Sequence, residues 1–291
     1  MAPSSAPDSR KLGIIAGRGA LPLHLAQNCQ ASGRAFFVLA IEGETRTDVE
    51  RFPHAWVRLG AVGAALEKLR EAACEDLVLI GPVARPDFGN LSLDWEGAKL
   101  APRLALAARR GDDALLSAVV KHVEGWGFRV LGVDDVMQEL RAPRGALGRH
   151  RPGPASEADI QRAVEVVHAL GEHDIGQGAV VCDGLVLAVE AIEGTDAMLR
   201  RCAELRPELR GSQEARRGVL LKRAKPGQDR RVDLPTIGVR TVELAAAAGL
   251  AGVAVEAGAT LIMDREELIR VADEHGLFVL GVASATNGAS E

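Results

Sequence analysis

Short apolar runs alternate with helical segments through the first half of the chain, and this alternation constrains the fold more than any other feature. A strand followed by a helix and a second strand is typical of a parallel sheet with right-handed crossover connections. We therefore predict an α/β fold with a parallel sheet in this half. The strands are expected at residues 12–16, 35–41, 54–59, 76–80 and 128–133, and the helices at 21–30, 63–73 and 114–125.

The second half of the chain changes to a mixed α/β order with hairpins. Asp183 and Gly184 separate two β-rich runs, and an Asp-Gly pair favours a tight hairpin turn. A second tight turn is expected at residues 257–258, and Ser156 and Asp264 are expected to cap the helices that follow them. The strands are expected at residues 178–182, 185–190, 218–223, 252–256, 260–263 and 277–282, and the helices at 157–170, 194–205, 241–248 and 265–275.

A stretch rich in Pro and Gly, residues 143–154, lies between the two halves. Such a composition predicts a linker, or alternatively a mobile loop at an active site. Residues 1–10 lack the hydrophobic core of a signal peptide, so we expect a disordered leader there. The predicted organisation is a leader (1–10), a first domain (11–142), a linker (143–155), a second domain (156–284) and a tail (285–291).

Composition excludes several classes of protein. The 35 Lys and Arg against 40 Asp and Glu give a net charge of −5, and aromatic residues make up 3%. Nucleic-acid binding needs clustered cations or stacking aromatics, so we predict no nucleic-acid partner. The four cysteines form no C-x-x-C pair and are expected to be reduced core residues. No apolar run approaches the ~20 residues of a membrane span, and we predict a cytoplasmic protein.

Two glycine-containing loops follow predicted strands. Gly17 and Gly19 stand between the first strand and its helix, where backbone N–H groups can approach a phosphate. The dinucleotide fingerprint requires a third glycine, but Pro22 occupies that position. Gly81 and Arg85 follow the fourth strand, at the sheet edge where α/β proteins bind ligands. The alternatives are a tight turn without a ligand and an exposed loop arginine.

Acidic side chains stand at further junctions between strands and helices. Glu42 and Glu44 follow the second strand, where a ribose-binding acid would lie. Asp112 and Asp113 precede a helix and fit a cap, a ribose contact or a Mg²⁺ site. Residues 190–196 place three acids at the end of a strand, where Thr195 or Asp196 fits a helix cap or the acids fit metal binding.

Two polar segments in the second half suggest a binding site. Two glycines flank Gln177, which indicates that the backbone closely approaches another group. Residues 222–238 are the densest stretch, with Lys222, Lys225, Arg231 and Asp233 among them. Such cations suit phosphates, and a carboxylate among them suits metal binding or water activation. A charged surface loop is the alternative.

Six segments in order along the chain resemble the LpxI-type UDP-2,3-diacylglucosamine pyrophosphatases of lipid A synthesis. They are residues 13–22 (GIIAGRGALP), 85–88 (RPDF), 111–113 (GDD), 174–181 (DIGQGAVV), 193–199 (EGTDAML) and 231–238 (RVDLPTIG). The resemblance extends over nearly the whole chain. The sequence departs from the family pattern at Arg18, where a third glycine is common, and at residues 82–84, where Asn-Val-Ser is common.

The resemblance implies a Rossmann-like N-terminal domain, a distinct C-terminal domain and a requirement for Mg²⁺ or a similar divalent cation. It implies hydrolysis of UDP-2,3-diacylglucosamine to UMP and 2,3-diacylglucosamine 1-phosphate (lipid X), in a homodimer with peripheral contact to the inner membrane. The family's catalytic aspartate corresponds to Asp233, which is also expected to bind metal, with Asp196 as a second metal ligand. The expected substrate-binding residues are Gly17, Gly19, Ala20, Leu21, Gly81, Arg85, Asp113, Gln177, Gly194, Thr195, Lys222, Lys225, Arg231, Thr236 and Gly238.

Two other functions remain open on the residues alone. The first strand, its glycine loop and Glu42 suit a nicotinamide-dependent oxidoreductase, although the third glycine is missing. A non-catalytic nucleotide sensor that opens and closes about residues 143–154 is the other alternative.

Overall fold

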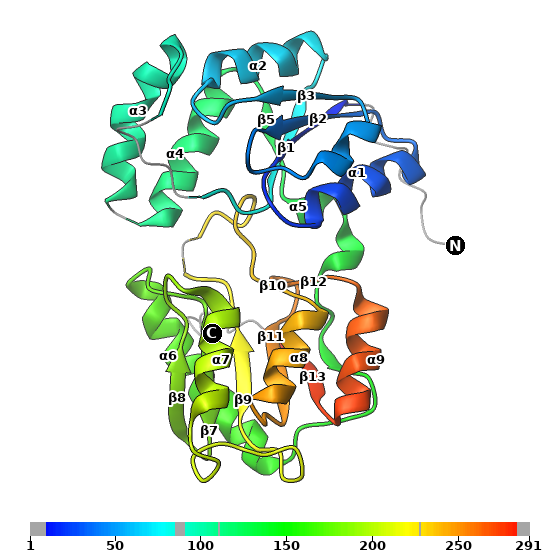
Figure 1. The fold of residues 1–291 in the computed structure, drawn as a ribbon, viewed down its shortest axis with the longest axis vertical. Coiled ribbons are helices and arrows are strands. Elements are labelled where there is room, and N and C mark those ends of the chain that lie inside the picture. The colour runs from blue at the N-terminus through cyan, green and yellow to red at the C-terminus, as the bar shows by residue number, and fades with distance from the viewer. Residues whose placement is uncertain (1–9, 85–90, 110, 227, 284–291) are drawn as a thin grey trace, which may run out of the picture. The chain divides into compact units, whose positions relative to one another are not determined.

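A computed structural model describes residues 10–84, 91–109, 111–226 and 228–283 (Figure 1). The chain divides into two compact units, each with its own sheet. Unit 1 comprises Met1–Gln138 together with Arg231–Asp233, and unit 2 comprises Glu139–Arg230 together with Leu234–Glu291. The prediction of an α/β protein with an N-terminal parallel sheet and a separate mixed α/β part is confirmed.

Unit 1 is built on a parallel sheet with the strand order β3-β2-β1-β4-β5 in the described chain. This is the strand order of the Rossmann-like class. Successive strands are added on one side of β1 up to β3 and then, from β4, on its other side. Ligands of open parallel sheets bind beyond the carboxyl ends of the strands at this reversal. The strands are β1 (Leu12–Ala16), β2 (Phe36–Ile41), β3 (His54–Val57), β4 (Asp76–Ile80) and β5 (Arg129–Val130).

Both faces of this sheet are covered. Leu39 and Leu77 on one face pack with Leu69 and Val120 of two helices. Ile14, on the opposite face, is also fully buried, as expected for a parallel sheet between helical layers. The helical segments are α1 (Leu21–Ser32), η1 (Thr47–Arg51), α2 (Val62–Glu71), α3 (Trp95–Ala108), α4 (Asp112–Gly125) and α5 (Val133–Val136), and η2 (Gln138–Leu140) lies at the boundary of the units.

Unit 2 contains a mixed sheet with the strand order β6-β13-β11-β9-β7-β8. Strands β9, β11 and β13 are parallel, whereas β6 and β7 run antiparallel to their neighbours. The carboxyl ends of β8, β9, β11 and β13 therefore meet at one edge. The strands are β6 (Gly145–Leu147), β7 (Gly178–Cys182), β8 (Leu185–Val189), β9 (Val219–Lys222), β11 (Gly252–Glu256) and β13 (Phe278–Val282), with a separate small sheet of β10 (Thr236–Ile237) and β12 (Leu261–Ile262).

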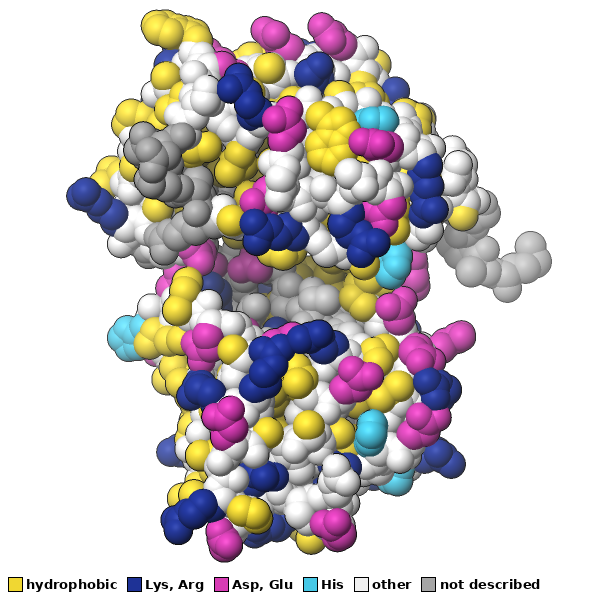
Figure 2. Space-filling model, in the orientation of Figure 1, with side chains coloured by type: hydrophobic (Ala, Val, Ile, Leu, Met, Phe, Trp, Pro, Cys, Tyr) yellow, Lys and Arg dark blue, Asp and Glu magenta, His cyan; other side chains and the backbone are white. Residues whose placement is uncertain are grey.

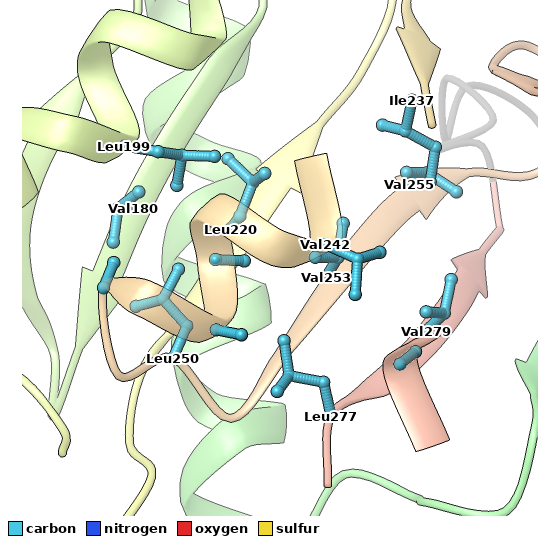
Figure 3. Close-up of a cluster of buried hydrophobic side chains, with 14 of the residues drawn as sticks. Val180, Leu199, Leu220, Ile237, Val242, Leu250, Val253, Val255, Leu277 and Val279 are labelled. Atoms are coloured by element: carbon cyan, nitrogen blue, oxygen red, sulfur yellow. The ribbon is translucent and has the colours of Figure 1, made fainter. Parts of the chain in front are cut away.

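Helices cover both faces of the mixed sheet. On one face, Leu220 and Val253 of the sheet pack with Leu199 and Val242 (Figure 3). On the other face, Val181 and Leu221 pack with a long helix. The helices of the first face are α7 (Gly194–Glu204), α8 (Val239–Ala247) and α9 (Arg265–His275), and the helix of the second face is α6 (Pro154–Glu172).

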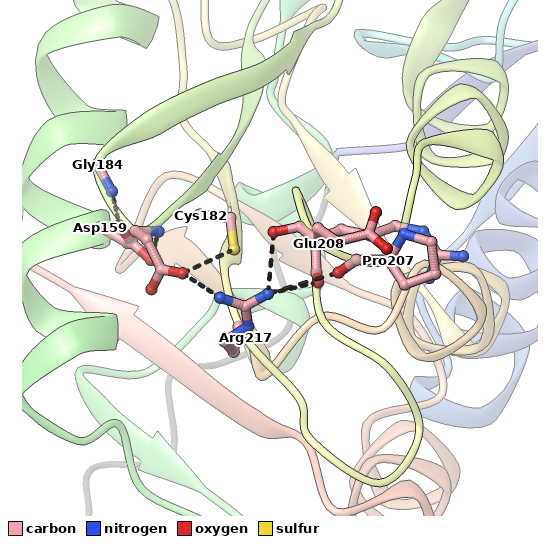
Figure 4. A network of polar contacts seen from close by, with 8 residues as sticks. Asp159, Cys182, Gly184, Pro207, Glu208 and Arg217 are labelled. Atoms are coloured by element: carbon pink, nitrogen blue, oxygen red, sulfur yellow. Dashed lines mark hydrogen bonds and ion pairs between the residues drawn. The ribbon is translucent and has the colours of Figure 1, made fainter.

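The Asp-Gly hairpin between β7 and β8 is confirmed and is fixed by a buried carboxylate. Asp183 and Gly184 have φ angles of 50° and 78°, as a tight hairpin turn requires. Both oxygens of Asp159 accept hydrogen bonds from this turn, at 3.1 Å from Asp183 N and 2.7 Å from Gly184 N (Figure 4). Arg217 pairs with Asp183 and also donates to the carbonyls of Pro207, Glu208 and Arg210, so the loop before β9 is held at this edge.

Several local predictions were wrong. The tight turn at residues 257–258 is present, but β12 after it pairs in parallel with β10 and forms no hairpin with β11. Helix α6 begins after Gly153, so Ser156 is not its cap. Asp264 does occupy the N-cap position of α9, as predicted, but its side chain makes no capping hydrogen bond. Helix α3 was not predicted, because Gly97 and Pro102 interrupt its pattern. The stretch proposed as a linker contains β6, which pairs with β13 at the edge of the sheet.

All four cysteines lie within the described ranges and are free and buried, as predicted. Burial raises the pKa of each thiol to about 11. Thiolate is the reactive form, so these side chains serve packing and not catalysis.

Candidate functional site

Two glycines bring loops together at the carboxyl ends of β1 and β4. A Cβ atom on Gly17 would lie 2.4 Å from the carbonyl oxygen of Gly81, and one on Gly81 would lie 2.5 Å from that of Arg18. Gly17 N and Arg18 N donate hydrogen bonds of 2.8 Å to the carbonyls of Ile80 and Pro82. The glycines are therefore required for loop–loop packing at the point where the strand order reverses.

Replacing Gly17 by Ala is expected to lower the free energy of unfolding by about 1–3 kcal/mol, because the added methyl group overlaps the opposite loop. Urea denaturation followed by circular dichroism measures this change. Gly125→Ala is the matched control, since a Cβ on that helical glycine meets nothing within 4 Å. Equal stability of both variants would contradict the packing role of Gly17.

Arg18 and Glu44 form a two-pronged ion pair beside this loop. Arg18 donates from Nε and from its terminal nitrogen to the two oxygens of Glu44, each at 2.8 Å. Glu44 also accepts a hydrogen bond of 2.9 Å from Ala84 N. Glu44, one of the two acids considered for ribose binding, is thus bound to Arg18 and to the loop after β4. Arg18, where the family commonly has glycine, leaves the backbone contact between the loops after β1 and β4 intact. Through Glu44 it also connects these two loops to the loop after β2.

The first turn of α1 follows the glycine loop and suits an anion. Ala20 precedes the helix without a capping side chain, and Pro22 occupies its first turn. The N–H groups of a first helical turn have no acceptor within the helix. Gly19 has a φ of 87° and no atoms near the position of a Cβ. Gly19, Ala20 and Leu21 therefore form an open helix N-terminus at the sheet edge, of the kind that binds phosphate.

Arg85 and Asp113 are the other two residues of the N-terminal half that were predicted to bind substrate. Arg85 lies outside the described residues. Asp113 lies in the first turn of α4, after Gly111, whose φ of 120° is accessible chiefly to glycine. The cap position of α4 is occupied by Gly111 and not by an aspartate. Asp112 and Asp113 lie in the first turn, where their negative charge stabilises the helix through its dipole.

The segment Arg231–Asp233 is anchored in unit 1 although the chain on either side belongs to unit 2. Arg231 pairs with Glu124 of α4 at 2.6 Å. Val232 packs against the core formed by Phe128 and its neighbours. Two consecutive residues therefore fix the position of Asp233, which is partly exposed. The guanidinium of Arg231, expected on phosphates, is bound to Glu124 and holds the segment in place.

In unit 2, Lys222 lies in a buried polar network at the carboxyl end of β9. Its Nζ donates to Thr195 Oγ1 at 2.7 Å and lies 3.4 Å from the carbonyl oxygen of Thr236. Thr195 in turn donates to Glu190 Oε1 at 2.8 Å, and Lys222 Nζ lies 3.9 Å from the same oxygen. Lys222 and Glu190 are only 5% and 6% exposed. The structure thus brings together three expected residues from β9, α7 and β10.

Glu190, one of the three acids considered for metal binding, lies in this network, although it was not among the expected substrate-binding residues. The two glycines flanking Gln177 do approach another group closely, as predicted, and that group is Glu190. A Cβ on Gly176 would lie 2.0 Å from the Glu190 carbonyl oxygen, and one on Gly178 would lie 2.6 Å from Glu190 Oε2. An acid directly at the end of an apolar strand was the available signal, and Glu256 at the end of β11 repeats it.

A second set of ion pairs adjoins this network. Lys225 pairs with Asp174, and its backbone N–H donates to Gln228. Arg223 and Arg230 flank the buried carboxylate of Glu256 at 3.5 and 3.7 Å. The edge therefore carries Lys222, Lys225, Arg223 and Arg230, and several of these cations are held by buried or partly buried carboxylates.

The remaining expected residues of unit 2 position local structure at the same edge. Gly194 is the first residue of α7 with a φ of 77°. Thr236 donates to the Leu234 carbonyl at the start of β10, and Gly238 occupies the cap position of α8. Thr195 and Asp196 lie in the first turn of α7 and do not cap it, because Glu193 takes that position.

Some buried polar atoms of this edge have no hydrogen-bond partner among the described residues. Glu190 Oε2, Gln177 Oε1 and Thr260 Oγ1 are inaccessible and accept or donate no hydrogen bond within the described parts of the chain. Buried polar atoms are normally satisfied by protein, water or ligand. Because neither oxygen is accessible, a buried water molecule is the partner that suits the acceptors of Glu190 and Gln177.

The proposed metal ligands, Asp233 and Asp196, suit Mg²⁺ only if substrate phosphate supplies further ligands to the same ion. Among the described residues, no three His, Cys, Asp or Glu side chains are grouped as a metal cage. Asp196 pairs with Arg240 at 2.5 Å and lies 3.7 Å from Arg200, and this positive surrounding argues against a second cation there. Of the two proposed metal ligands Asp233 remains, and Mg²⁺ commonly binds through one or two carboxylates plus substrate phosphates and water.

The fold and these residues define a two-unit α/β protein with a nucleotide-type sheet in one unit and a cation-rich sheet edge in the other. Comparison with known proteins agrees with this class. The model of the LpxI N-terminal domain family matches residues 11–140, and that of the LpxI C-terminal domain matches residues 143–280.

A named relative is also similar along nearly its whole length. The UDP-2,3-diacylglucosamine pyrophosphatase LpxI of Caulobacter vibrioides is 53% identical over 273 residues, which cover 94% of this chain and 98% of the relative. The chain belongs to the LpxI family, and the resemblance inferred from the six segments is confirmed.

Proposed function

We propose that this protein hydrolyses the diphosphate of UDP-2,3-diacylglucosamine and releases UMP and 2,3-diacylglucosamine 1-phosphate for lipid A synthesis. The observation that carries the proposal is the 53% identity to a UDP-2,3-diacylglucosamine pyrophosphatase over 94% of the chain. Membership in this family favours a hydrolase over a nicotinamide-dependent oxidoreductase or a nucleotide sensor.

In this proposal the edge of unit 1 binds the nucleotide half of the substrate. The open N-terminus of α1 at Gly19, Ala20 and Leu21 supplies N–H groups and a positive helix dipole for a phosphate. Gly17 and Gly81 hold the two loops in register, and Asp113 and Arg85 are assigned to the same half.

The edge of unit 2 binds the diphosphate and sugar. Lys222 and Lys225 are assigned to the phosphate oxygens, since cations there neutralise the negative charge that moves to the leaving group. Thr195, Gln177, Thr236, Gly194 and Gly238 complete the surface. Glu190 accepts the hydroxyl hydrogen of Thr195 and lies near Lys222 Nζ, so it fixes the positions of both side chains.

The reaction consumes one water molecule. Its oxygen forms a new bond to one phosphorus, the bridging P–O bond breaks, and the water protons are distributed to solvent and to the departing phosphate. Asp233 is proposed to orient the attacking water, a role for which a carboxylate fixed by two anchored neighbours is suited. Bound Mg²⁺, held by Asp233, would neutralise phosphate charge during this step.

The cellular setting is also a proposal. We infer a cytoplasmic homodimer that touches the inner membrane, where a diacylated substrate resides. None of the helices in the described ranges is both long and apolar enough to span a bilayer.

Metal dependence gives the sharpest test of this chemistry. The metal-stripped protein is expected to release no uridine nucleotide from UDP-2,3-diacylglucosamine, and added Mg²⁺ is expected to restore release. Mass spectrometry should then identify UMP and the lipid monosaccharide phosphate in equal amounts. Unchanged turnover in EDTA would refute the Mg²⁺ requirement, and release of UDP in place of UMP would refute the assigned bond.

A further inference from the structure

Helix α3 of unit 1 presents an apolar stripe to solvent. Trp95 is 75% exposed and Leu106 is 63% exposed. Ala98 and Pro102 lie between them and are exposed as well. Spacings of three, four and four residues place the four side chains on one face of the helix. A surface helix normally presents polar residues on this face, so the stripe requires an explanation.

The stripe is held on a rigid base. Asp94 caps α3 by accepting from Gly97 N at 2.7 Å, and it also accepts from Ala64 N of α2 at 3.1 Å. A Cβ on Gly97 would lie 2.4 Å from the Gly60 carbonyl oxygen. The opposite face of α3 packs on α2 and α4, with Leu100 buried. The exposed face is therefore presented by a fixed helix.

Cations border the stripe. Lys99, Arg103 and Arg109 are exposed on α3 and at its end, whereas Glu96 is the one acid in Trp95–Arg109. Glu96 pairs with Lys99 at 2.7 Å, and Lys99 Nζ also lies 5.1 Å from the centre of the Trp95 ring. Over the region where Figure 1 places α3, Figure 2 shows hydrophobic side chains at the surface beside Lys or Arg.

We propose that this face of α3 docks on an anionic phospholipid surface. Tryptophan and leucine flanked by Lys and Arg are typical of helices that lie in a membrane interface. The cations complement anionic headgroups, each favouring binding about fivefold. A second copy of the chain fits this face less well, because a two-fold contact would bring the same cations of both copies together. This inference rests on the proposed function, because membrane docking would bring the enzyme to its diacylated substrate.

The proposal is tested by sedimentation with vesicles of phosphatidylcholine mixed with phosphatidylglycerol. Wild-type protein is expected to bind with a blue shift of tryptophan emission, and more weakly to phosphatidylcholine alone. The double variant Trp95→Ser/Leu106→Ser is expected to bind on the order of 100-fold more weakly. The control Leu185→Ser, a comparably exposed leucine (57%) on β8 of unit 2, is expected to bind like wild type.

Hydrolysis assays separate this proposal from the proposed function. With substrate dispersed in detergent, the double variant is expected to match wild type, and with substrate in vesicles it is expected to be slower. Wild-type hydrolysis of dispersed substrate without vesicle binding would overturn the docking and leave the function intact. Absence of hydrolysis in both forms would overturn the function alone. If the double variant bound vesicles normally but changed the oligomeric mass, the face would belong to a second copy and the docking would be refuted.

Discussion

Asp233→Asn is expected to lower the turnover of UDP-2,3-diacylglucosamine by about 10²–10⁴-fold, the usual range for loss of a positioned acid–base group. The amide keeps the size of the carboxylate but neither bears its charge nor accepts a proton. Stability should stay near wild type, because Asp233 is partly exposed and its segment is held by Arg231 and Val232. Steady-state kinetics and a thermal melt measure the two quantities.

Asp183→Asn is the matched control for this substitution. Asp183 lies in the β7–β8 turn, at the sheet edge opposite to the candidate site, and asparagine also tolerates its φ of 50°. Its turnover should match wild type. Near-normal turnover of folded Asp233→Asn would remove Asp233 from the mechanism.

Lys222→Met is expected to lower the free energy of unfolding by about 3–5 kcal/mol, because it leaves Glu190 buried without its cation. Methionine retains much of the length and apolar stem of lysine, so lost packing contributes little. Chemical denaturation of the variant measures the change.

The double variant Lys222→Met/Glu190→Gln shows how much of the stability lost in Lys222→Met comes from the unpaired buried charge of Glu190 and how much comes from packing. Neutralising Glu190 should recover much of the lost stability, since no unpaired buried charge remains. Substrate affinity should not recover, because the ammonium assigned to phosphate is still absent. If the single variant were as stable as wild type, the buried pair would have no structural role. If the double variant were no more stable than Lys222→Met, the cost would lie in packing.

The sequence predicts those elements of the fold whose pattern is local and strongly periodic. Strands β1 and β4 were placed at their observed bounds, and the Asp-Gly turn defined the hairpin of β7 and β8. Helix α3 was not predicted because Gly97 and Pro102 lower its helix propensity. The helix is stabilised instead by the Asp94 cap and by packing on α4. The pairing of β10 with β12 joins two-residue strands far apart in sequence, which no periodicity reveals.

The candidate site was predictable where the backbone itself sets the requirement. Glycines after β1 and β4, and those flanking Gln177, mark close backbone approaches that a single sequence displays. The role of Glu190 was not predictable, since its contacts to Thr195 and Lys222 depend on the order of strands in the sheet. The pairing of Arg231 with Glu124 likewise joins distant parts of the chain, so the sequence alone does not reveal it.

Phosphorus NMR of UDP-2,3-diacylglucosamine during incubation with the purified protein and Mg²⁺ shows which phosphate groups the reaction produces. The two diphosphate resonances are expected to disappear together while two phosphate monoester resonances grow in equal amounts, one of UMP and one of the diacylated sugar phosphate. Persistence of the diphosphate resonances with folded protein present would contradict the proposed hydrolysis.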